Sequence, residues 1–314
     1  MVLSQEAVKQ NEVNVINVWQ HNIRQEFALM RKHVQHYPYV AMDTEFPGVV
    51  ATPVGNFLKK EKYNYHQVCC NVNMLKLIQV GLTFMNEKGE LPTGNPVYQF
   101  NFHFNLEDDM YSTESIELLS RCGLDFDRHM NEGISMSEFG EILTTSGLVT
   151  DPRVKWLTYS AGYDFGYLIK AILTKGLPDE ESEFDLLLAK LFPTSIDIKS
   201  LLMADNRTRY SLRGGLQEIA MMLDIERYGQ QHQAGSDSLL TGATYFTLRK
   251  RFFSETYQEV IDSVIGKLYG LGDTLSGQDE GTPSRPTSTN KVRTNILSIT
   301  RADTVDGDKC LNFA

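Results

Sequence analysis

Two carboxylates at the end of a short apolar segment are the first residues that could do chemistry. Asp43 and Glu45 lie two positions apart in Tyr39–Glu45, whose composition predicts a strand. Alternation along a strand places both side chains on one face. Taken alone, carboxylates at a strand end are most often solvated. Because this strand is apolar enough to be buried, however, its two like charges need a cation or protons to compensate them.

Two further aspartates lie where helices are predicted to begin. Asp164 follows a glycine turn, and Asp237 lies in the first turn of a helix expected from about Ser236. Either aspartate alone could simply stabilise the positive end of its helix. His232 stands out among the seven histidines because it leads into this helix start, five residues before Asp237.

One kind of chemistry accounts for these residues together. Carboxylate oxygens are hard ligands that suit Mg²⁺ or Mn²⁺ better than zinc. Two such ions, about 3.5–4 Å apart, form a clamp for in-line displacement at phosphorus. A nearby imidazole is a natural acceptor for the proton of the attacking water. The residues therefore predict a two-metal-ion hydrolase of phosphodiesters, with His232 as general base and four metal ligands, Asp43, Glu45, Asp164 and Asp237.

The elements that must position these residues follow from periodicity and turn signals. Strands are expected at 39–45, 75–85, 97–104, 155–159 and 195–198. Helices are expected at 13–34, from 163, at 184–191, from 214 and at 236–253, with short helices between 112 and 147 and an irregular stretch at 51–71. Three successive strands followed by alternating helices and strands predict an α/β fold with a mixed sheet flanked by helices.

Composition limits the classes of protein that remain. The chain has 314 residues, 41% of them hydrophobic, and no apolar run approaches the roughly 18 residues of a membrane span. We expect an intracellular protein with four reduced cysteines, since none has zinc or C-x-x-C spacing. The net charge of −10 argues against a broad basic surface for duplex DNA, although a nuclease can recover positive charge as bound cations.

Four sequence segments carry a family resemblance. Asp-x-Glu, a distant Asp and His-x-x-x-x-Asp together resemble the DEDD exonucleases of the histidine subtype. Their flanking residues are similar to those of the Caf/Pop deadenylases, in Val40-Ala41-Met42-Asp43-Thr44-Glu45-Phe46-Pro47-Gly48, Gly162-Tyr163-Asp164-Phe165-Gly166-Tyr167, Gly214-Gly215-Leu216-Gln217-Glu218 and His232-Gln233-Ala234-Gly235-Ser236-Asp237-Ser238-Leu239-Leu240-Thr241-Gly242. The segments occur in the family's order, and the resemblance covers roughly residues 12–272.

The resemblance implies a fold, an activity and a set of partners. It implies one RNase H-like exonuclease domain over 12–272, after an extension at 1–11 and before a tail at 273–314 whose polar composition predicts disorder. The implied activity shortens mRNA poly(A) tails from the 3′ end and releases 5′-AMP, as a catalytic subunit of the CCR–NOT complex. The implied partners are poly(A) RNA, the NOT scaffold subunit, a CCR-type nuclease and BTG/Tob-type proteins. No membrane partner is expected, and the implied location is cytoplasmic and nuclear.

The resemblance also implies a role for each site residue. Asp43 would bridge both metal ions, Glu45 and Asp237 would hold the ion that carries the water, and Asp164 would serve the second ion. His232 would be the general base. Asp197, at the end of a predicted strand, could support these ligands from behind. Phe46 and Phe165 flank ligands and could stack on adenines, although core packing is the simpler interpretation.

Two alternative functions remain open from the sequence. The same site would serve a 3′→5′ exonuclease for DNA or for RNA of any sequence, because no residue is shown to recognise adenine or the 2′-hydroxyl. A chain with this fold could also act chiefly as a scaffold or adaptor in an mRNA-decay complex, with secondary or broader exonuclease activity.

Overall fold

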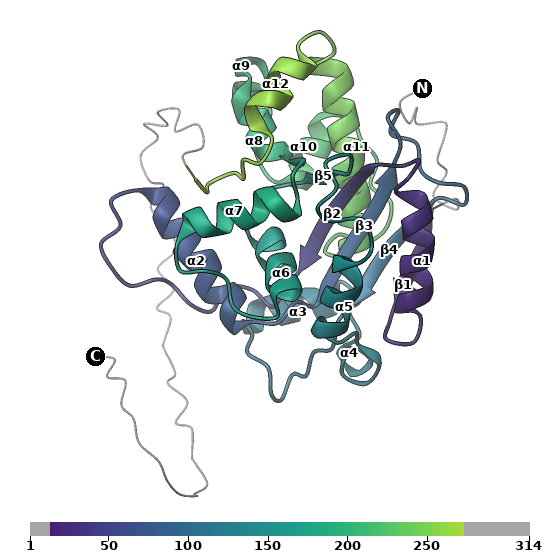
Figure 1. Ribbon diagram of the computed structural model, residues 1–314, viewed down its shortest axis with the longest axis vertical. Helices are drawn as coiled ribbons and strands as arrows, with labels where there is room; N and C mark the ends of the chain where they lie inside the picture. Colours follow the sequence, from purple (N-terminus) through teal and green to yellow (C-terminus); the bar gives the residue numbers. More distant parts are fainter. Residues whose placement is uncertain (1–12, 273–314) are drawn as a thin grey trace, which may run out of the picture. The chain divides into compact units, whose positions relative to one another are not determined.

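The computed structural model describes residues 13–272. A six-stranded mixed sheet forms the centre of this part of the chain (Figure 1). From edge to edge its strands are β1 (Asn14–Val18), β4 (Pro96–Asn101), β3 (Gln79–Met85), β2 (Tyr39–Glu45), β5 (Lys155–Thr158) and β6 (Ser195–Asp197). The antiparallel strands β2, β3 and β4 form the centre; β1 is parallel to β4, and β5 and β6 are parallel to β2. The predicted α/β class with a mixed sheet is confirmed.

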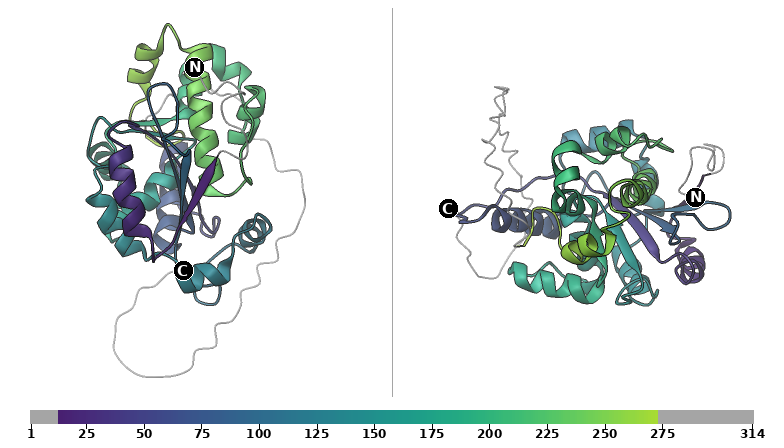
Figure 2. Two further views of the ribbon diagram at one scale, coloured as in Figure 1. Left: turned by 90° about the vertical axis from the view of Figure 1, so that its right-hand side faces the viewer. Right: turned by 90° about the horizontal axis from the view of Figure 1, so that it is seen from above.

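Helices cover both faces of this sheet. One face packs against α1 (Ile23–His33), α2 (Lys60–Met74), α5 (Met136–Thr144), α6 (Gly162–Leu173) and α7 (Glu181–Leu191). The other packs against α8 (Ile198–Ala204), α10 (Leu216–Met222), α11 (Ala234–Phe252) and α12 (Tyr257–Val264). Figure 2 shows α1 and α11 on opposite sides of the sheet. The remaining helices are α3 (Thr113–Arg121), α4 (Phe126–Glu132) and α9 (Asn206–Ser211).

Side-chain alternation along β2 explains why both faces are apolar. Val40 and Met42 belong to the hydrophobic cluster on the α6 side, whereas Tyr39 and Ala41 belong to the cluster on the α11 side. Asp43 continues the second series, so it faces α11. Among the described residues, no helix is both long and apolar enough to cross a membrane.

Two predicted segments were wrong. The predicted helix 13–34 is instead the strand β1 followed by α1, because its β-branched first residues pair with β4 from Asn14 to Val18. The predicted irregular stretch 51–71 contains most of α2, whose buried side packs on α6 although its exposed side is polar. The helices α8, α9 and α12 were not predicted. The expected extension 1–11 and tail 273–314 lie outside the described residues, and the domain boundaries stay a prediction.

The candidate ligands gather where β2 outruns its neighbour β5. Strand β5 pairs only with Tyr39–Ala41, so the last residues of β2 have an open edge on that side. The chain leaves β5 at the same level and turns into α6. In α/β sheets, ligands bind in such crevices at the carboxyl ends of strands. The topology therefore places Asp43 and Glu45 beside the beginning of α6.

Gly81 lets α11 approach the sheet opposite these carboxylates. It pairs with Asp43 in the register of β2 and β3. A Cβ atom at Gly81 would lie 1.8 Å from the carbonyl oxygen of Ala234, the first residue of α11. Only hydrogen fits between this strand and the helix, which brings the first turn of α11 directly over Asp43.

We expect Gly81→Ala to destabilise the fold by about 1–3 kcal/mol or more, because the added methyl group must push the beginning of α11 away from β3. Chemical denaturation monitored by circular dichroism measures this loss. Gly166→Ala is the control, since a Cβ there comes no closer than 3.1 Å to flexible side chains. Equal stability of the Gly81→Ala protein and the wild type would contradict the close approach.

Candidate functional site

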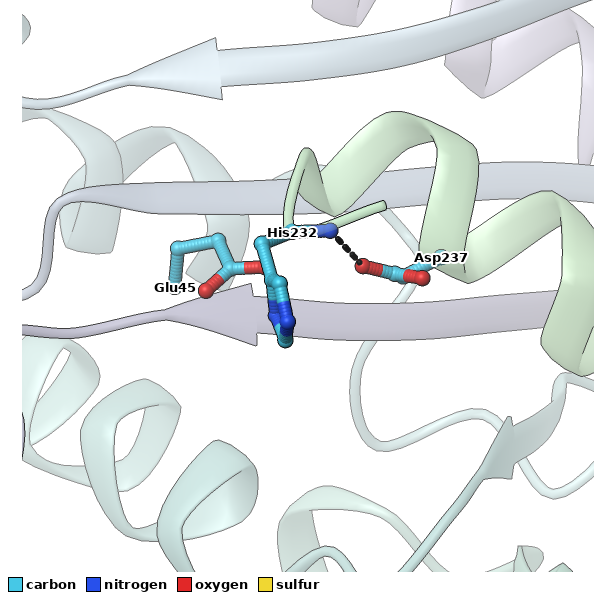
Figure 3. Close-up of side chains that lie close together, drawn as sticks. All are labelled: Glu45, His232 and Asp237. Atoms are coloured by element: carbon cyan, nitrogen blue, oxygen red, sulfur yellow. Dashed lines mark hydrogen bonds between the residues drawn. The ribbon is translucent and has the colours of Figure 1, made fainter. Parts of the chain in front are cut away.

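Four carboxylates and one imidazole converge at the end of β2. Asp43 and Glu45 come from the strand, Asp164 from the first turn of α6, and Asp237 from the first turn of α11. One potential ligand atom from each of Glu45, His232 and Asp237 lies within 4.8 Å of the others. In Figure 3 the imidazole of His232 lies between the carboxyl groups of Glu45 and Asp237. The structure thus brings all five predicted site residues together.

Burial, and to a lesser degree the neighbouring carboxylates, disfavours negative charge on three of these side chains. Burial, reinforced by Asp237 and Asp164, raises the pKa of Asp43 and of Glu45 well above their usual ranges. Burial also raises the pKa of Asp164, to about 7. All three side chains keep partial access to solvent, so a cation can reach them. Without a cation, this site holds protons near neutral pH.

His232 adopts a left-handed backbone conformation with φ of +61°, which is uncommon for a residue other than glycine. Its backbone amide donates a hydrogen bond of 2.9 Å to Oδ2 of Asp237. That bond fixes the loop against the first turn of α11 and directs the ring toward Glu45 (Figure 3). Such strained residues cluster at functional sites, where surrounding contacts hold them.

Arg227 provides a positive charge that the sequence did not reveal. Its Nη1 donates to Oδ1 of Asp237 at 2.5 Å and to Oγ of Ser236 at 3.0 Å. Its Nε donates to Oε1 of Gln217 in α10, also at 2.5 Å. The arginine side chain is only 13% exposed. This guanidinium partly offsets the four carboxylates and lowers the pKa of Asp43 and of Glu45 against the stronger effect of burial.

Asp164 is held by two neighbours. The hydroxyl of Thr44 donates a hydrogen bond of 2.8 Å to its Oδ1, which lowers the pKa of Asp164 against the effect of burial. The fully buried Asp197 accepts hydrogen bonds from the amides of Ser160 and Ala161, at 2.8 and 3.1 Å, in the turn that begins α6. Asp197 therefore positions Asp164 through this turn, which supports the possibility considered from the sequence.

Two glutamines from the sheet cap the beginning of α11. The first amides of a helix have no partner inside the helix. Oε1 of Gln79 accepts from the amide of Ala234 at 3.2 Å, and Oε1 of Gln99 accepts from the amide of Gly235 at 3.0 Å. The sheet thus replaces the side-chain cap that Gln233, the residue before α11, does not provide.

Further side-chain amides fix these two glutamines. Nε2 of Gln99 donates to Gln233 Oε1 at 2.9 Å and to Asn17 Oδ1 at 3.0 Å. Nε2 of Gln79 donates to Asn101 Oδ1 at 2.8 Å. In the register of the sheet, Gln79 pairs with Glu45 of β2 on one side and with Asn101 of β4 on the other. The amide network therefore lies in the same row across the sheet as Glu45, a candidate metal ligand. The network ties the loop of His232 to the sheet.

The two phenylalanines beside the ligands have different environments. Phe165 is fully buried in the core, so the suggestion that it stacks on adenine is wrong. Phe46 is partly exposed and stacks on Tyr163, with ring centroids 4.8 Å apart and planes 19° apart. Gly214 and Gly215 precede α10, as expected, and Gly215 lies at its N-cap.

The donor set fits hard divalent cations. Clustered carboxylates disfavour their own ionisation, and one imidazole lies at their edge. Thiols are no part of the cluster, and the described cysteines Cys69, Cys70 and Cys122 are free, as expected. Oxygen-rich sets of this kind prefer Mg²⁺ or Mn²⁺.

Comparison with known proteins gives consistent results. A family model described as CAF1 family ribonuclease matches residues 18–140 and 153–245, which include all five site residues. "CCR4-NOT transcription complex subunit 7" of Caenorhabditis elegans is 56% identical over 265 residues, which make up 84% of this chain and 86% of that protein.

Solved structures agree with this match. The Mg²⁺- and Mn²⁺-bound form of Pop2p from S. pombe is 44% identical, with a TM-score of 0.77, over 82% of this chain and 99% of that chain. A chain in the structure of the yeast NOT1 MIF4G domain co-crystallised with CAF1 is 31% identical, with a TM-score of 0.63, over 77% and 91% of the two chains. The predicted RNase H-like fold is confirmed.

Without divalent metal, we expect stability to fall as the pH rises toward 8. Folding raises the pKa of Asp164 from 3.8 to about 7, so the folded protein prefers the protonated acid and loses stability as this proton leaves. Asp43 and Glu45 act in the same direction. Saturating Mn²⁺ should raise the melting temperature more at pH 8 than at pH 5, because protons compete with the ion.

The variant Asp43→Asn tests the cause of this pH dependence. In EDTA at pH 8 it should melt a few degrees above the wild type, given roughly 2–4 °C per kcal/mol for a protein of this size. The exposed Glu117→Gln is the control and should change nothing. A wild-type melting temperature that stays flat between pH 5 and 8 in EDTA would refute the explanation.

We expect Gln99→Met to weaken Mn²⁺ binding by roughly 10–100-fold, as for other residues that orient metal ligands. Methionine keeps the volume but cannot accept from Gly235, so the beginning of α11 and Asp237 lose their alignment. Thr83→Val is the matched control, because it removes a buried hydrogen bond of 2.8 Å to Ser238 farther along α11. Titration followed by Mn²⁺ electron paramagnetic resonance measures both affinities. Equal weakening by both variants would mean that Gln99 contributes only to stability.

Proposed function

The chain belongs to the CAF1 family of ribonucleases, and from that membership we propose that it is a 3′→5′ exoribonuclease that shortens mRNA poly(A) tails. The observation that carries the proposal is the convergence of Asp43, Glu45, Asp164 and Asp237 with His232 at one end of the sheet. These residues all lie in the part of the chain that matches the family.

The four carboxylates would hold two divalent cations, Mg²⁺ or Mn²⁺. Pop2p, a structural relative, was solved with both kinds of ion. When bound, the ions supply Lewis acidity that activates water and stabilises charge on the phosphate and on the leaving 3′ oxygen. The chain contributes the fixed positions of its carboxylates, which β2, α6 and α11 hold from three directions.

Hydrolysis then needs one proton acceptor, and His232 fills that role. The water oxygen forms a bond to phosphorus, the bond from phosphorus to the 3′ oxygen breaks, the leaving 3′ oxygen takes up a proton from solvent, and the released nucleotide is 5′-AMP. An imidazole accepts a proton readily near neutral pH. The bond from the His232 amide to Asp237 holds the backbone, so the ring keeps its place beside Glu45 while the proton moves.

We also propose that the protein works as a catalytic subunit of a CCR–NOT complex, in the cytoplasm and the nucleus. Its relative in Caenorhabditis elegans is named a CCR4-NOT subunit, and a similar yeast chain was co-crystallised with a NOT1 domain. A NOT-type scaffold is therefore the best-supported partner. A CCR-type nuclease and BTG/Tob-type proteins are further proposed partners by family resemblance.

Asp43→Ala should slow the shortening of a 5′-labelled, A-tailed RNA by on the order of 10³-fold or more. The variant lacks a carboxylate that would hold the metal ions, and these ions stabilise charge in the transition state by roughly several kcal/mol. Denaturing gels resolve the ladder of shortened products. EDTA should abolish the ladder and added Mg²⁺ or Mn²⁺ should restore it. Equal shortening by the wild type and the variant, or by neither protein, would refute the proposal.

Two comparisons in the same assay separate the alternatives. Equal rates on A-tailed RNA, oligo(U) and oligo(dA) would indicate a general exonuclease. If an Asp43→Ala, Glu45→Ala protein fully restores mRNA decay in cells that lack the wild-type protein, the scaffold role would be the main one.

A further inference from the structure

We propose that a basic strip beside the site, exposed except at the partly buried Arg209, binds the single-stranded RNA upstream of the bond that is cut. The strip consists of Arg209, Tyr210, Arg213 and the Gly214–Gly215 pair. This inference rests on the proposed function and deepens it, since it identifies where the RNA lies outside the carboxylate cluster.

The strip is locally positive in an acidic chain. The chain has a net charge of −10, yet residues 206–213 contain three arginines and no acidic residue. Arg207 is paired with Asp205 at 2.7 Å. For Arg209 and Arg213, no ion pair with a carboxylate occurs within residues 13–272. These two guanidinium groups therefore remain available to phosphate, the group that dominates binding to nucleic acids.

Tyr210 adds an aromatic surface between the two arginines. Its side chain is 66% exposed. The guanidinium carbons of Arg209 and Arg213 each lie 5.9 Å from the centroid of its ring. Aromatic rings interleaved with positive charge are the usual platform for single strands, because every base can stack on them.

Gly214 and Gly215 join the strip to the catalytic end of the sheet. The carbonyl of Gly214 accepts a hydrogen bond of 2.7 Å from the hydroxyl of Tyr159, which directly precedes the turn into α6. Two residues after Gly215, the side chain of Gln217 accepts from Arg227, and Arg227 donates to Asp237. Two side chains, Gln217 and Arg227, therefore link the residues just after the strip to a metal-ligand candidate, and the strip continues along the chain toward Tyr210.

The shape of the strip suits a backbone rather than a particular base. Gly214, Gly215 and Arg213 are all exposed, and φ of Gly214 is +128°, so this turn requires a residue without a side chain. A sugar–phosphate chain can approach the bare turn closely. With the 3′ end at the carboxylates, the upstream nucleotides would cross the glycines and reach the arginines and Tyr210.

The double variant Arg209→Gln, Arg213→Gln and the single variant Tyr210→Ala test this proposal by steady-state kinetics. For a 20-nucleotide oligo(A), each should raise KM by roughly tenfold or more with kcat unchanged. The dinucleotide ApA is too short to reach the strip, so its hydrolysis should not change. The variants should lose affinity for oligo(U) and for oligo(A) by the same factor. Tyr210→Trp, which keeps an aromatic ring, should bind RNA as the wild type does. Loss of the arginines should also reduce the dependence of log K on log salt by about 0.7 per lost phosphate contact.

The double variant Arg31→Gln, Arg153→Gln is the matched control. It removes the same charge from exposed positions, and Arg153 lies before β5, at the end of the sheet opposite the carboxylates. It should leave KM for oligo(A) unchanged. Equal KM values for the wild type and the strip variants would overturn the proposal. So would an equal effect on ApA and on oligo(A), since that would indicate a disturbed catalytic site.

A binding measurement separates this proposal from the proposed function. Fluorescence anisotropy of 5′-labelled oligo(A) in EDTA records affinity without cleavage. If the wild type cuts no RNA yet binds it more tightly than the strip variants, the proposed function fails and the strip stands as an RNA site. If the variants bind RNA as well as the wild type but lose an acidic protein partner, the strip is a protein-docking surface and the proposal fails.

Discussion

Burial of clustered carboxylates, together with the repulsion between them, is the constraint on which the rest of this structure depends. Asp43 and Glu45 share one face of β2, and Asp237 and Asp164 approach them from two helices. Close, partly buried like charges oppose folding unless protons or cations neutralise them. The fold must therefore hold these groups together against their repulsion, while it leaves enough access for cations to arrive. Arg227 alone cannot balance four negative charges, so protons or divalent cations must compensate the rest.

The fold meets this constraint through contacts that do not involve the charged atoms. Gly81 removes the side chain that would separate α11 from β3, and the carbonyl of Ala234 occupies that space. Gln79 and Gln99 then accept hydrogen bonds from the first amides of α11. On the other side of β2, Asp197 performs the same task for the turn before α6. Both helices that carry candidate ligands are thus fixed at or just before their first turns by polar groups from the sheet or its edge, which keeps these carboxylates in place when no cation is bound.

The sequence predicted the site better than it predicted its supports. Period-two alternation was enough to place Asp43 and Glu45 on one face, and helix-start signals were enough to place Asp164 and Asp237 in first turns. Apart from Asp197, the supporting residues were not predictable in this way, because Gln99 and Gly235 are 136 positions apart and a glutamine in a strand carries no local signal of its partner. The same limit explains the errors in the fold. β1 is a strand only because β4 pairs with it, and α2 is ordered by packing on α6 despite its polar composition.

Net charge was a poor guide to the distribution of charge, and that distribution determines how a polyanion can use this surface. A chain with a net charge of −10 should repel RNA on average. At the end of β2, however, bound divalent ions would offset the negative groups, and this site would then attract phosphate rather than repel it. The arginines before α10 add positive charge that needs no ion. In the proposed 3′→5′ reaction only the 3′ end would enter the metal-dependent part, and the upstream chain would stay outside it. The two sources of positive charge would therefore not respond in the same way to removal of the metal. Loss of metal would remove catalysis and attraction at the carboxylates together, whereas the arginines would still hold the RNA.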